Sequence, residues 1–72
     1  MVSIAKRMHD LREDHDETQK QIAALLRLPP ARISEWERGV HTPSIHTLII
    51  LADHWQVSID YIAGVTNNPK RY

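Results

Sequence analysis

The stretch TQKQIAALLRLPPARISEWERG, residues 18–39, contains the signals that decide the fold. It opens on T-x-x-Q, in which the Thr18 hydroxyl can accept from the Gln21 amide while the Gln21 side chain accepts from the Thr18 amide, a capping box that starts a helix. Pro30 suits the first position of a second helix because it has no N–H to leave unpaired, and Gly39 can adopt the left-handed conformation that ends it. The stretch therefore predicts two short helices joined by a tight link at residues 27–30. The residues expected to point into a core are Ile22, Ala23, Leu26, Ile33 and Trp36.

Helical spacing continues towards the N-terminus of this stretch. Ile4, Met8 and Leu11 recur at i, i+4 and i+7, which predicts an amphipathic helix over residues 4–13. The polar run EDHDE, residues 13–17, is expected to end it.

Two further helices are expected after Gly39. Either Thr42 or Ser44 can cap the first of them, and the sequence leaves that choice open. Its apolar stripe, taken as core, is Ile45, Leu48, Ile49 and Ala52. Ser58 caps a short last helix, with Val57 and Ile62 placed to form a hydrophobic staple, and residues 67–72 are expected to fray. The fold class is all-α, with five helices in one domain at residues 1–66 and a short C-terminal tail at residues 67–72.

Composition narrows the class of protein. The chain has 72 residues, no cysteine and a formal net charge of zero, which predicts a single small core without disulfides or thiolate metal sites and argues against a general polycation. Its longest apolar run, residues 48–52, is far shorter than the roughly 20 residues that span a bilayer, so neither a membrane nor a signal segment is expected. The cytoplasm is the expected compartment. The middle of the chain is modestly basic, with Lys20, Arg27, Arg32 and Arg38 against Glu35 and Glu37.

Catalytic and metal-binding patterns are weak. The five histidines are His9, His15, His41, His46 and His54, and no two of them have the i, i+4 spacing of a helical zinc motif. We therefore expect no metal, no cofactor and no enzymatic activity. Trp36 and Trp55 lie among aliphatic residues at helical spacing, which favours core positions.

Two short helices joined by a tight link are typical of the helix-turn-helix, whose second helix enters a DNA major groove. The chain resembles the phage repressor and Cro type of helix-turn-helix, also called the xenobiotic-response-element type, over about residues 4–66. The matching segments are LRED, TQKQIAALL, RISEWERG, TPSIHTLIILADHW and VSIDYIAGVTNNP. The resemblance implies a five-helix, lambda-repressor-like DNA-binding domain, with the helix-turn-helix formed by helices two and three.

The resemblance also implies roles for individual residues. Thr18 and Gln19 match the start of the second helix, where the glutamine contacts phosphate and supports the third helix. Pro30, Ala31, Ser34 and Glu35 match positions that face the major groove, Arg32 and Arg38 match positions that contact the DNA backbone, and Thr42 lies in the flanking loop. Glu35 is expected either to accept from a cytosine amino group or to orient an arginine such as Arg38. Arg12 and Glu37 match a buried ion pair between the first and third helices.

Three positions depart from the family pattern. Arg27 and Gln56 occupy positions where the family usually has glycine, and a left-handed conformation at each would cost roughly 1 kcal/mol. Pro29 replaces the usual serine or threonine cap of the third helix, which leaves the amides there without a side-chain acceptor.

The resemblance therefore implies a transcriptional regulator of the repressor type that binds a two-fold symmetric double-stranded DNA operator as a homodimer. Ile59 and Tyr61 on the last helix are candidates either for the core or for the dimer interface. The alternative function is a protein-interaction module, an antitoxin or adaptor with the same fold, and a protein antirepressor or toxin is a possible partner.

Overall fold

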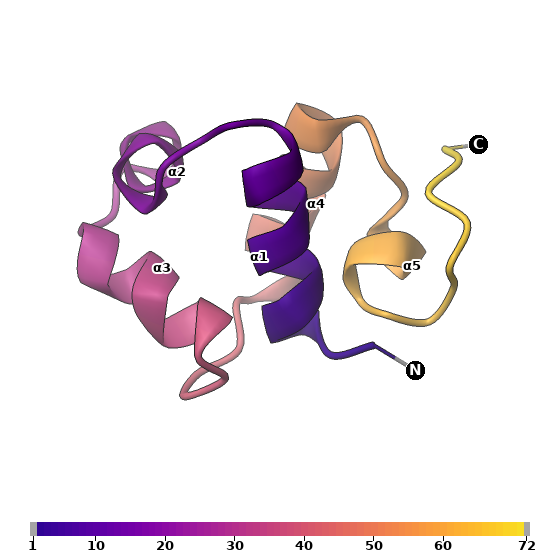
Figure 1. Cartoon of the computed structure of the whole chain (residues 1–72), viewed down its shortest axis with the longest axis horizontal. Coiled ribbons are helices and arrows are strands. Elements are labelled where there is room, and N and C mark those ends of the chain that lie inside the picture. The colour runs from indigo at the N-terminus through magenta and orange to yellow at the C-terminus, as the bar shows by residue number, and fades with distance from the viewer. Residues whose placement is uncertain (1, 72) are drawn as a thin grey trace.

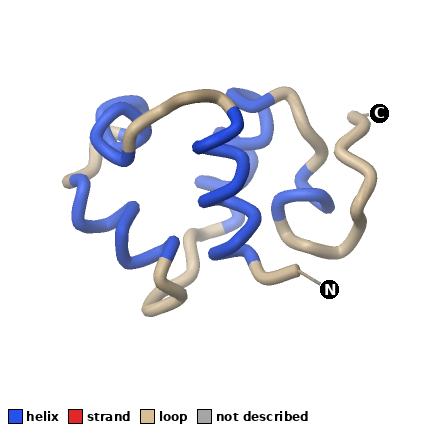
Figure 2. Tube along the Cα trace, in the orientation of Figure 1, coloured by secondary structure: helices blue, strands red, loops and turns tan. Residues whose placement is uncertain are grey.

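In a computed structural model that describes residues 2–71, the chain folds into five helices and no strand. They are α1 (Ile4–Asp14), α2 (Gln19–Leu26), α3 (Pro30–Glu37), α4 (Ile45–Trp55) and α5 (Ile59–Ile62). Figure 1 shows α1 in the middle, with α2 and α3 on one side and α5 with the C-terminal segment on the other. Figure 2 shows that short loops make all the connections. The all-α, five-helix prediction is confirmed.

Side-chain caps define the starts of four helices. Ser3 accepts from the Lys6 amide at the start of α1, and Ser44, rather than Thr42, accepts from the Thr47 amide at the start of α4. Thr18 and Gln21 form both halves of the predicted capping box before α2. Ser58 caps α5 as expected. The local sequence therefore determines where these helices begin.

Within residues 2–71, three non-glycine residues have left-handed backbone conformations. Arg27 ends α2 at φ 57° and Gln56 ends α4 at φ 56°. Both residues, which stand where the family usually has glycine, therefore have the strained left-handed backbone that was expected of them. Asp16, in the α1–α2 connection, is a third case at φ 55° that the sequence analysis missed. Gly39 has a φ of 75° after α3, in agreement with its predicted role.

The core lies where α1, α2, α3 and α4 meet and extends to α5. Its residues are Met8, Leu11, Ile22, Ala23, Ile33, Trp36, Leu48, Leu51, Ala52, Trp55, Val57 and Ile62. Both tryptophans and both members of the predicted staple are among them, and Leu26 packs against this cluster while partly exposed.

The predicted buried stripe of α4 is wrong at two of its four positions. Ile45 is 62% exposed and Ile49 is 47% exposed. The buried face instead consists of Leu48, Leu51, Ala52 and Trp55, which have the same i, i+3, i+4, i+7 spacing but start one turn later. Because α4 is apolar on more than one face, periodicity alone could not identify the side that faces the core and α5.

The segment after α5 is not frayed as far as it is described. The Pro69 carbonyl accepts from the Ser58 amide at 3.1 Å, and Arg71 Nη1 donates to the Ala52 carbonyl at 3.1 Å. Gly64 lets the two ends of the chain approach each other, because a Cβ at this position would overlap the Val2 carbonyl. Residues 67–71 are therefore hydrogen-bonded to the helical domain, and Tyr72 lies outside the described residues.

Candidate nucleic-acid interface

α3 is held by one face and exposed on the other. Ile33 is fully buried and Trp36 nearly so, and these are the buried residues of the helix. Pro30, Ala31 and Arg32 at its start are exposed, as is Arg38 just after its end, while Ser34 and Glu35 are half-buried. The positions that were expected to face DNA thus lie on or beside the uncovered face.

Polar side chains on this face contact one another within the helix. Arg32 Nε lies 3.7 Å from Glu35 Oε1, and Arg38 Nε donates to Ser34 Oγ at 3.3 Å. Glu35 therefore pairs with Arg32 in this structure, and the orientation of an arginine by Glu35 on DNA stays a prediction. The i, i+3 spacing of Arg32 and Glu35 places them on adjacent turns of the same face.

The start of α3 lacks a side-chain cap, as expected from Pro29. The Arg32 amide instead donates to the Pro29 carbonyl at 3.0 Å. A helix N-terminus without a side-chain acceptor leaves partial positive charge at the surface, where an anion is favoured.

A polar network around Glu37 holds α3 from behind. Arg12 Nε donates to Glu37 Oε2 at 2.7 Å and Arg12 Nη2 donates to Oε1 at 3.0 Å, so the ion pair between α1 and α3 is present. Gln19 Nε2 donates to Glu37 Oε1 at 3.2 Å, and His9 Nδ1 lies 3.1 Å from the same oxygen. The Glu37 side chain is 5% exposed. One carboxylate therefore joins α1, α2 and α3.

The charge on Glu37 is stabilised by these contacts. Burial raises the pKa of a carboxyl group, but hydrogen bonds from Arg12, His9 and Gln19 outweigh it, so the pKa of Glu37 lies below its ordinary value. Arg12 is also fixed at its other end, where Nη1 donates to the Glu17 carbonyl at 2.8 Å.

The two predicted residues at the start of α2 differ in their contacts. Thr18 is exposed, and its hydroxyl accepts from the Gln21 amide, so the side chain serves the helix cap. Gln19 is half-buried and reaches Glu37, which matches the supporting role that the resemblance implied.

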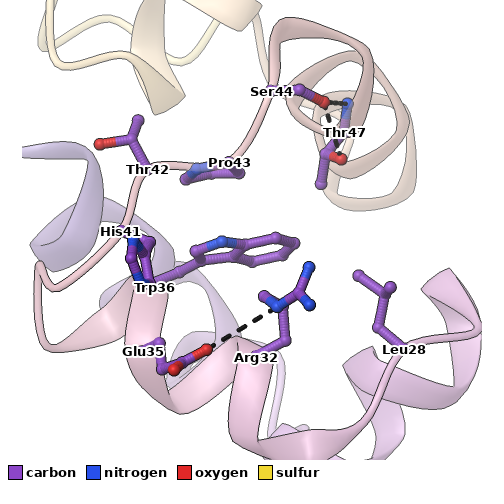
Figure 3. Close-up of a pocket in the computed structure, with 9 residues that line it drawn as sticks. All are labelled: Leu28, Arg32, Glu35, Trp36, His41, Thr42, Pro43, Ser44 and Thr47. Atoms are coloured by element: carbon purple, nitrogen blue, oxygen red, sulfur yellow. Dashed lines mark hydrogen bonds and ion pairs between the residues drawn. The ribbon is translucent and has the colours of Figure 1, made fainter.

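A surface hollow of about 560 Å³ lies between α3 and the start of α4. Figure 3 shows Arg32 and Glu35 along one side, Thr42 and Ser44 along the other, and the Trp36 ring between them. The loop that carries Thr42 therefore borders the same hollow as the outward side chains of α3.

Sequence analysis missed a second carboxylate network, at Glu17. Trp55 Nε1 donates to Glu17 Oε1 at 2.7 Å, and His54 Nε2 lies 2.6 Å from Glu17 Oε2. Burial opposes ionisation here too, but the hydrogen bonds from Trp55 and His54 outweigh it and lower the pKa of Glu17. The partners are 37 and 38 residues away in sequence, and no local pattern signals such pairs.

Arg7 is a second residue whose contacts were not predicted from the sequence. It is 5% exposed, its guanidinium carbon lies 3.8 Å from the centre of the Tyr61 ring, and Nη2 donates to Asn67 Oδ1 at 3.2 Å. Tyr61 is thus half-buried between Arg7 and the core, whereas Ile59 is exposed. Figure 1 shows their helix, α5, on the opposite side of α1 from α3.

Residues 2–71 contain no group of three or more histidine, cysteine, aspartate or glutamate side chains arranged to hold a metal ion. None of the helices formed by these residues has the length and hydropathy needed to cross a bilayer.

Known proteins resemble this chain in sequence and in fold. A helix-turn-helix family model matches residues 8–62. Two Bacillus subtilis (strain 168) proteins are each 33% identical: the uncharacterized HTH-type transcriptional regulator YobD, over 89% of this chain and 57% of its own length, and the HTH-type transcriptional regulator ImmR, over 88% and 50%. The chain thus spans about half the length of these curated relatives.

A solved structure shares the fold. It is the P22 c2 repressor protein in complex with synthetic operator 9T, which has a TM-score of 0.77 and 24% sequence identity, and the match covers 86% of this chain and 94% of that one. Together with the two short helices α2 and α3, which a tight link joins, and the exposed face of α3, the family match establishes that the chain belongs to the helix-turn-helix family of the phage repressor and Cro type.

Proposed function

We propose that this chain is a sequence-specific DNA-binding domain of a transcriptional repressor, with α3 as the recognition helix. The observation that carries the proposal is the two-sided environment of α3. Ile33, Trp36 and the Glu37 network fix one side, while the other side is uncovered. A helix of eight residues is too short to be stable alone, so it must be held by its surroundings.

The residues of this surface divide into positioning and reading roles. Arg32 and Arg38 carry positive charge at its edge and are assigned to phosphates, as are Thr18, Gln19 and Thr42 in the flanking segments. Ser34 and Glu35 are the polar groups that reach base edges, and Pro30 and Ala31 supply apolar contact, for example with a thymine methyl group. Since the net charge is zero, affinity depends on this local arrangement and not on overall attraction.

Two copies are proposed to bind a two-fold symmetric operator, with their α3 helices about 34 Å apart, one turn of DNA. The exposed Ile59 on α5 is assigned to the contact between copies, and Tyr61, held under Arg7, supports it from within. An operator that overlaps a promoter would then exclude polymerase. Such a regulator acts in the compartment that holds the DNA, the cytoplasm of a bacterial cell.

The test is a selection from a random duplex pool with the purified chain, followed by mobility-shift titration. We expect an enriched consensus made of two inverted half-sites. Ala31→Glu is the matched control: residue 31 is exposed and the first turn of a helix tolerates a carboxylate, so helicity should persist while the selected duplex is no longer bound. A folded wild-type chain that enriches no sequence would refute the proposal and support the protein-interaction alternative.

A further inference from the structure

His9 on α1 lies between two carboxylates. Its Nε2 is 2.9 Å from Glu13 Oε1 on the same helix, and its Nδ1 is 3.1 Å from Glu37 Oε1 at the end of α3. A neutral imidazole carries a proton on only one nitrogen and can donate to one of these oxygens, whereas the protonated ring donates to both. The surroundings of the two ring nitrogens therefore match the protonated form.

Arg12 is the third charged group that faces His9. Its Nη2 lies 3.4 Å from His9 Nδ1, where the lone pair of a neutral ring can accept from it. The protonated ring has no lone pair at this nitrogen, which instead becomes a donor to Glu37. A proton on His9 thus exchanges a contact with Arg12 for one with the Glu37 carboxylate. The His9 side chain is 44% exposed, so solvent can supply this proton.

Glu37 Oε1 has more donors than lone pairs when His9 is protonated. Arg12 Nη2 donates to this oxygen at 3.0 Å and Gln19 Nε2 donates to it at 3.2 Å. A carboxylate oxygen has about two lone-pair sites, which these two donors fill. Protonated His9 is a third donor, and its charge makes it a stronger one than the neutral Gln19 amide. Gln19 is therefore the donor that protonated His9 displaces.

The hollow beside His9 borders the surface assigned to DNA. It measures about 640 Å³, and the other residues that line it include Lys6, Gln19, Glu37 and Arg38. Gln19 and Arg38 are both assigned to phosphates, so a DNA backbone that reaches both passes the mouth of this hollow. A Gln19 amide released from Glu37 can then donate to a phosphate, with the positive charge of His9 on the same side.

We propose that His9 is a positioning residue whose proton strengthens DNA binding: protonated His9 takes the place of Gln19 on Glu37, and Gln19 donates to a DNA phosphate instead. This inference rests on the proposed DNA-binding function and adds its dependence on pH. Histidine side chains change charge between about pH 5 and pH 8, so affinity for DNA falls as the pH rises through this range. By linkage, DNA raises the proton affinity of His9 by the same factor.

The first experiment follows the free chain by nuclear magnetic resonance from about pH 8.5 to about pH 5. The ring protons of His9 and the side-chain amide of Gln19 should shift with one common midpoint, because the gain of the proton and the loss of the Gln19 bond are one event. In His9→Gln, the Gln19 amide should no longer shift in this range. A Gln19 amide that stays fixed while His9 titrates would refute the displacement.

The second experiment measures affinity for the selected duplex at constant ionic strength. Wild-type binding should be about fivefold tighter at about pH 6 than at about pH 8, the lower end of ordinary coupling between two sites. His9→Gln should bind weakly at both pH values, and His9→Arg, which carries a permanent charge, should bind tightly at both. His46→Gln is the matched control, because His46 is an exposed histidine on α4, and it should keep the wild-type dependence. Circular dichroism checks that each variant is folded.

The outcomes separate this proposal from the proposed function. A pH dependence that persists in His9→Gln would refute the role of His9, and its loss in His41→Gln would then assign the proton to His41, which borders the hollow beside α3. Equal wild-type affinity at both pH values would also refute the proposal, while selection of a consensus would leave DNA recognition intact. A wild-type chain that selects no sequence would refute the function itself, and the free-chain titration would still decide whether His9 displaces Gln19.

Discussion

At the scale of single residues, Glu37 connects more helices than any other side chain described above. Its carboxylate receives hydrogen bonds from α1 and α2 while being almost fully buried at the end of α3. A buried ion pair contributes little net stability compared with apolar residues of the same shape, but removal of one partner leaves the other charge buried and unpaired.

Glu37→Ala should therefore lower the free energy of unfolding by about 3–5 kcal/mol, because it leaves Arg12 without its carboxylate. Urea denaturation followed by circular dichroism measures the change. Asp14→Ala is the control: Asp14 is an exposed carboxylate on α1, and its loss should change stability by about 0.5 kcal/mol or less. Equal stability of Glu37→Ala and the wild type would show that the pair is unimportant.

The carboxylates of Glu37, which is buried, and Glu17, which is partly buried, also predict how stability depends on pH. The pKa values of Glu17 and Glu37 lie below the ordinary value of 4.5 in the folded chain, so the folded state binds these protons less tightly than the unfolded state. Their contribution is complete above about pH 4.5 and is lost as the pH falls towards the folded-state values.

Urea midpoints measured from pH 7 to pH 3 should therefore fall most steeply below about pH 4.5. A Glu17→Gln, Glu37→Gln double variant should be less stable at pH 7 and show a shallower decline. Asp14→Asn, which removes an exposed carboxylate on α1, should retain the wild-type slope. Identical slopes in all three proteins would contradict the assignment to Glu17 and Glu37.

At the scale of helices, local signals explain where each one begins, and two strained residues explain where α2 and α4 end. Arg27 and Gln56 both adopt the left-handed conformation that glycine accepts without a Cβ clash. In each case the residue's own amide donates back into the preceding helix, so the turn is hydrogen-bonded despite the strain.

Arg27→Gly and Gln56→Gly should each raise the unfolding free energy by up to about 1 kcal/mol, since relief of the left-handed strain exceeds the added entropy of the unfolded chain. Thermal melts of the single and double variants measure this, and the two effects should be nearly additive if the sites are independent. Gly39→Ala is the inverse control. Residue 39 also has a positive φ, so adding a Cβ there introduces the left-handed strain and should destabilise the domain. Lower stability of both glycine variants would contradict this explanation.

Recognition by α3 gives a further prediction at this scale. Arg32→Ala and Arg38→Ala should each weaken binding to all duplexes alike and reduce the salt dependence by about one unit, as expected for a lost phosphate contact. Glu35→Gln should instead change which base is preferred, because a carboxylate tolerated near phosphates must accept from a base or orient an arginine, and Arg32 is the arginine beside it. Repeated selection with each variant measures both effects. An unchanged consensus for Glu35→Gln would remove Glu35 from base recognition.

At the scale of the whole molecule, the sequence predicted more about local structure than about packing. All five helices and the capping box of Thr18 and Gln21 followed from short-range patterns, whereas the left-handed conformations of Arg27 and Gln56 were expected from the family pattern. The wrong face of α4 and the hydrogen-bonded segment 67–71 depended on contacts between elements. The same reason explains why Arg7 and Glu17 were missed, since their partners are distant in sequence. The pair of Arg12 and Glu37 came only from the family resemblance.

The arrangement of two domains on DNA predicts a strict dependence on half-site spacing. Two α3 helices one DNA turn apart face the same side of the duplex, so inserting about five base pairs between the half-sites would turn one of them to the opposite side. Cooperative binding to the selected operator should then disappear, while each half-site retains its own weak affinity. Mobility-shift titration of both duplexes measures this, and Ile59→Asp, which places a charge in the proposed contact, should remove cooperativity on the unmodified operator too. If the inserted operator is bound as cooperatively as the original one, the two domains do not contact each other across a two-fold axis, and the single domain would be the unit that recognises DNA.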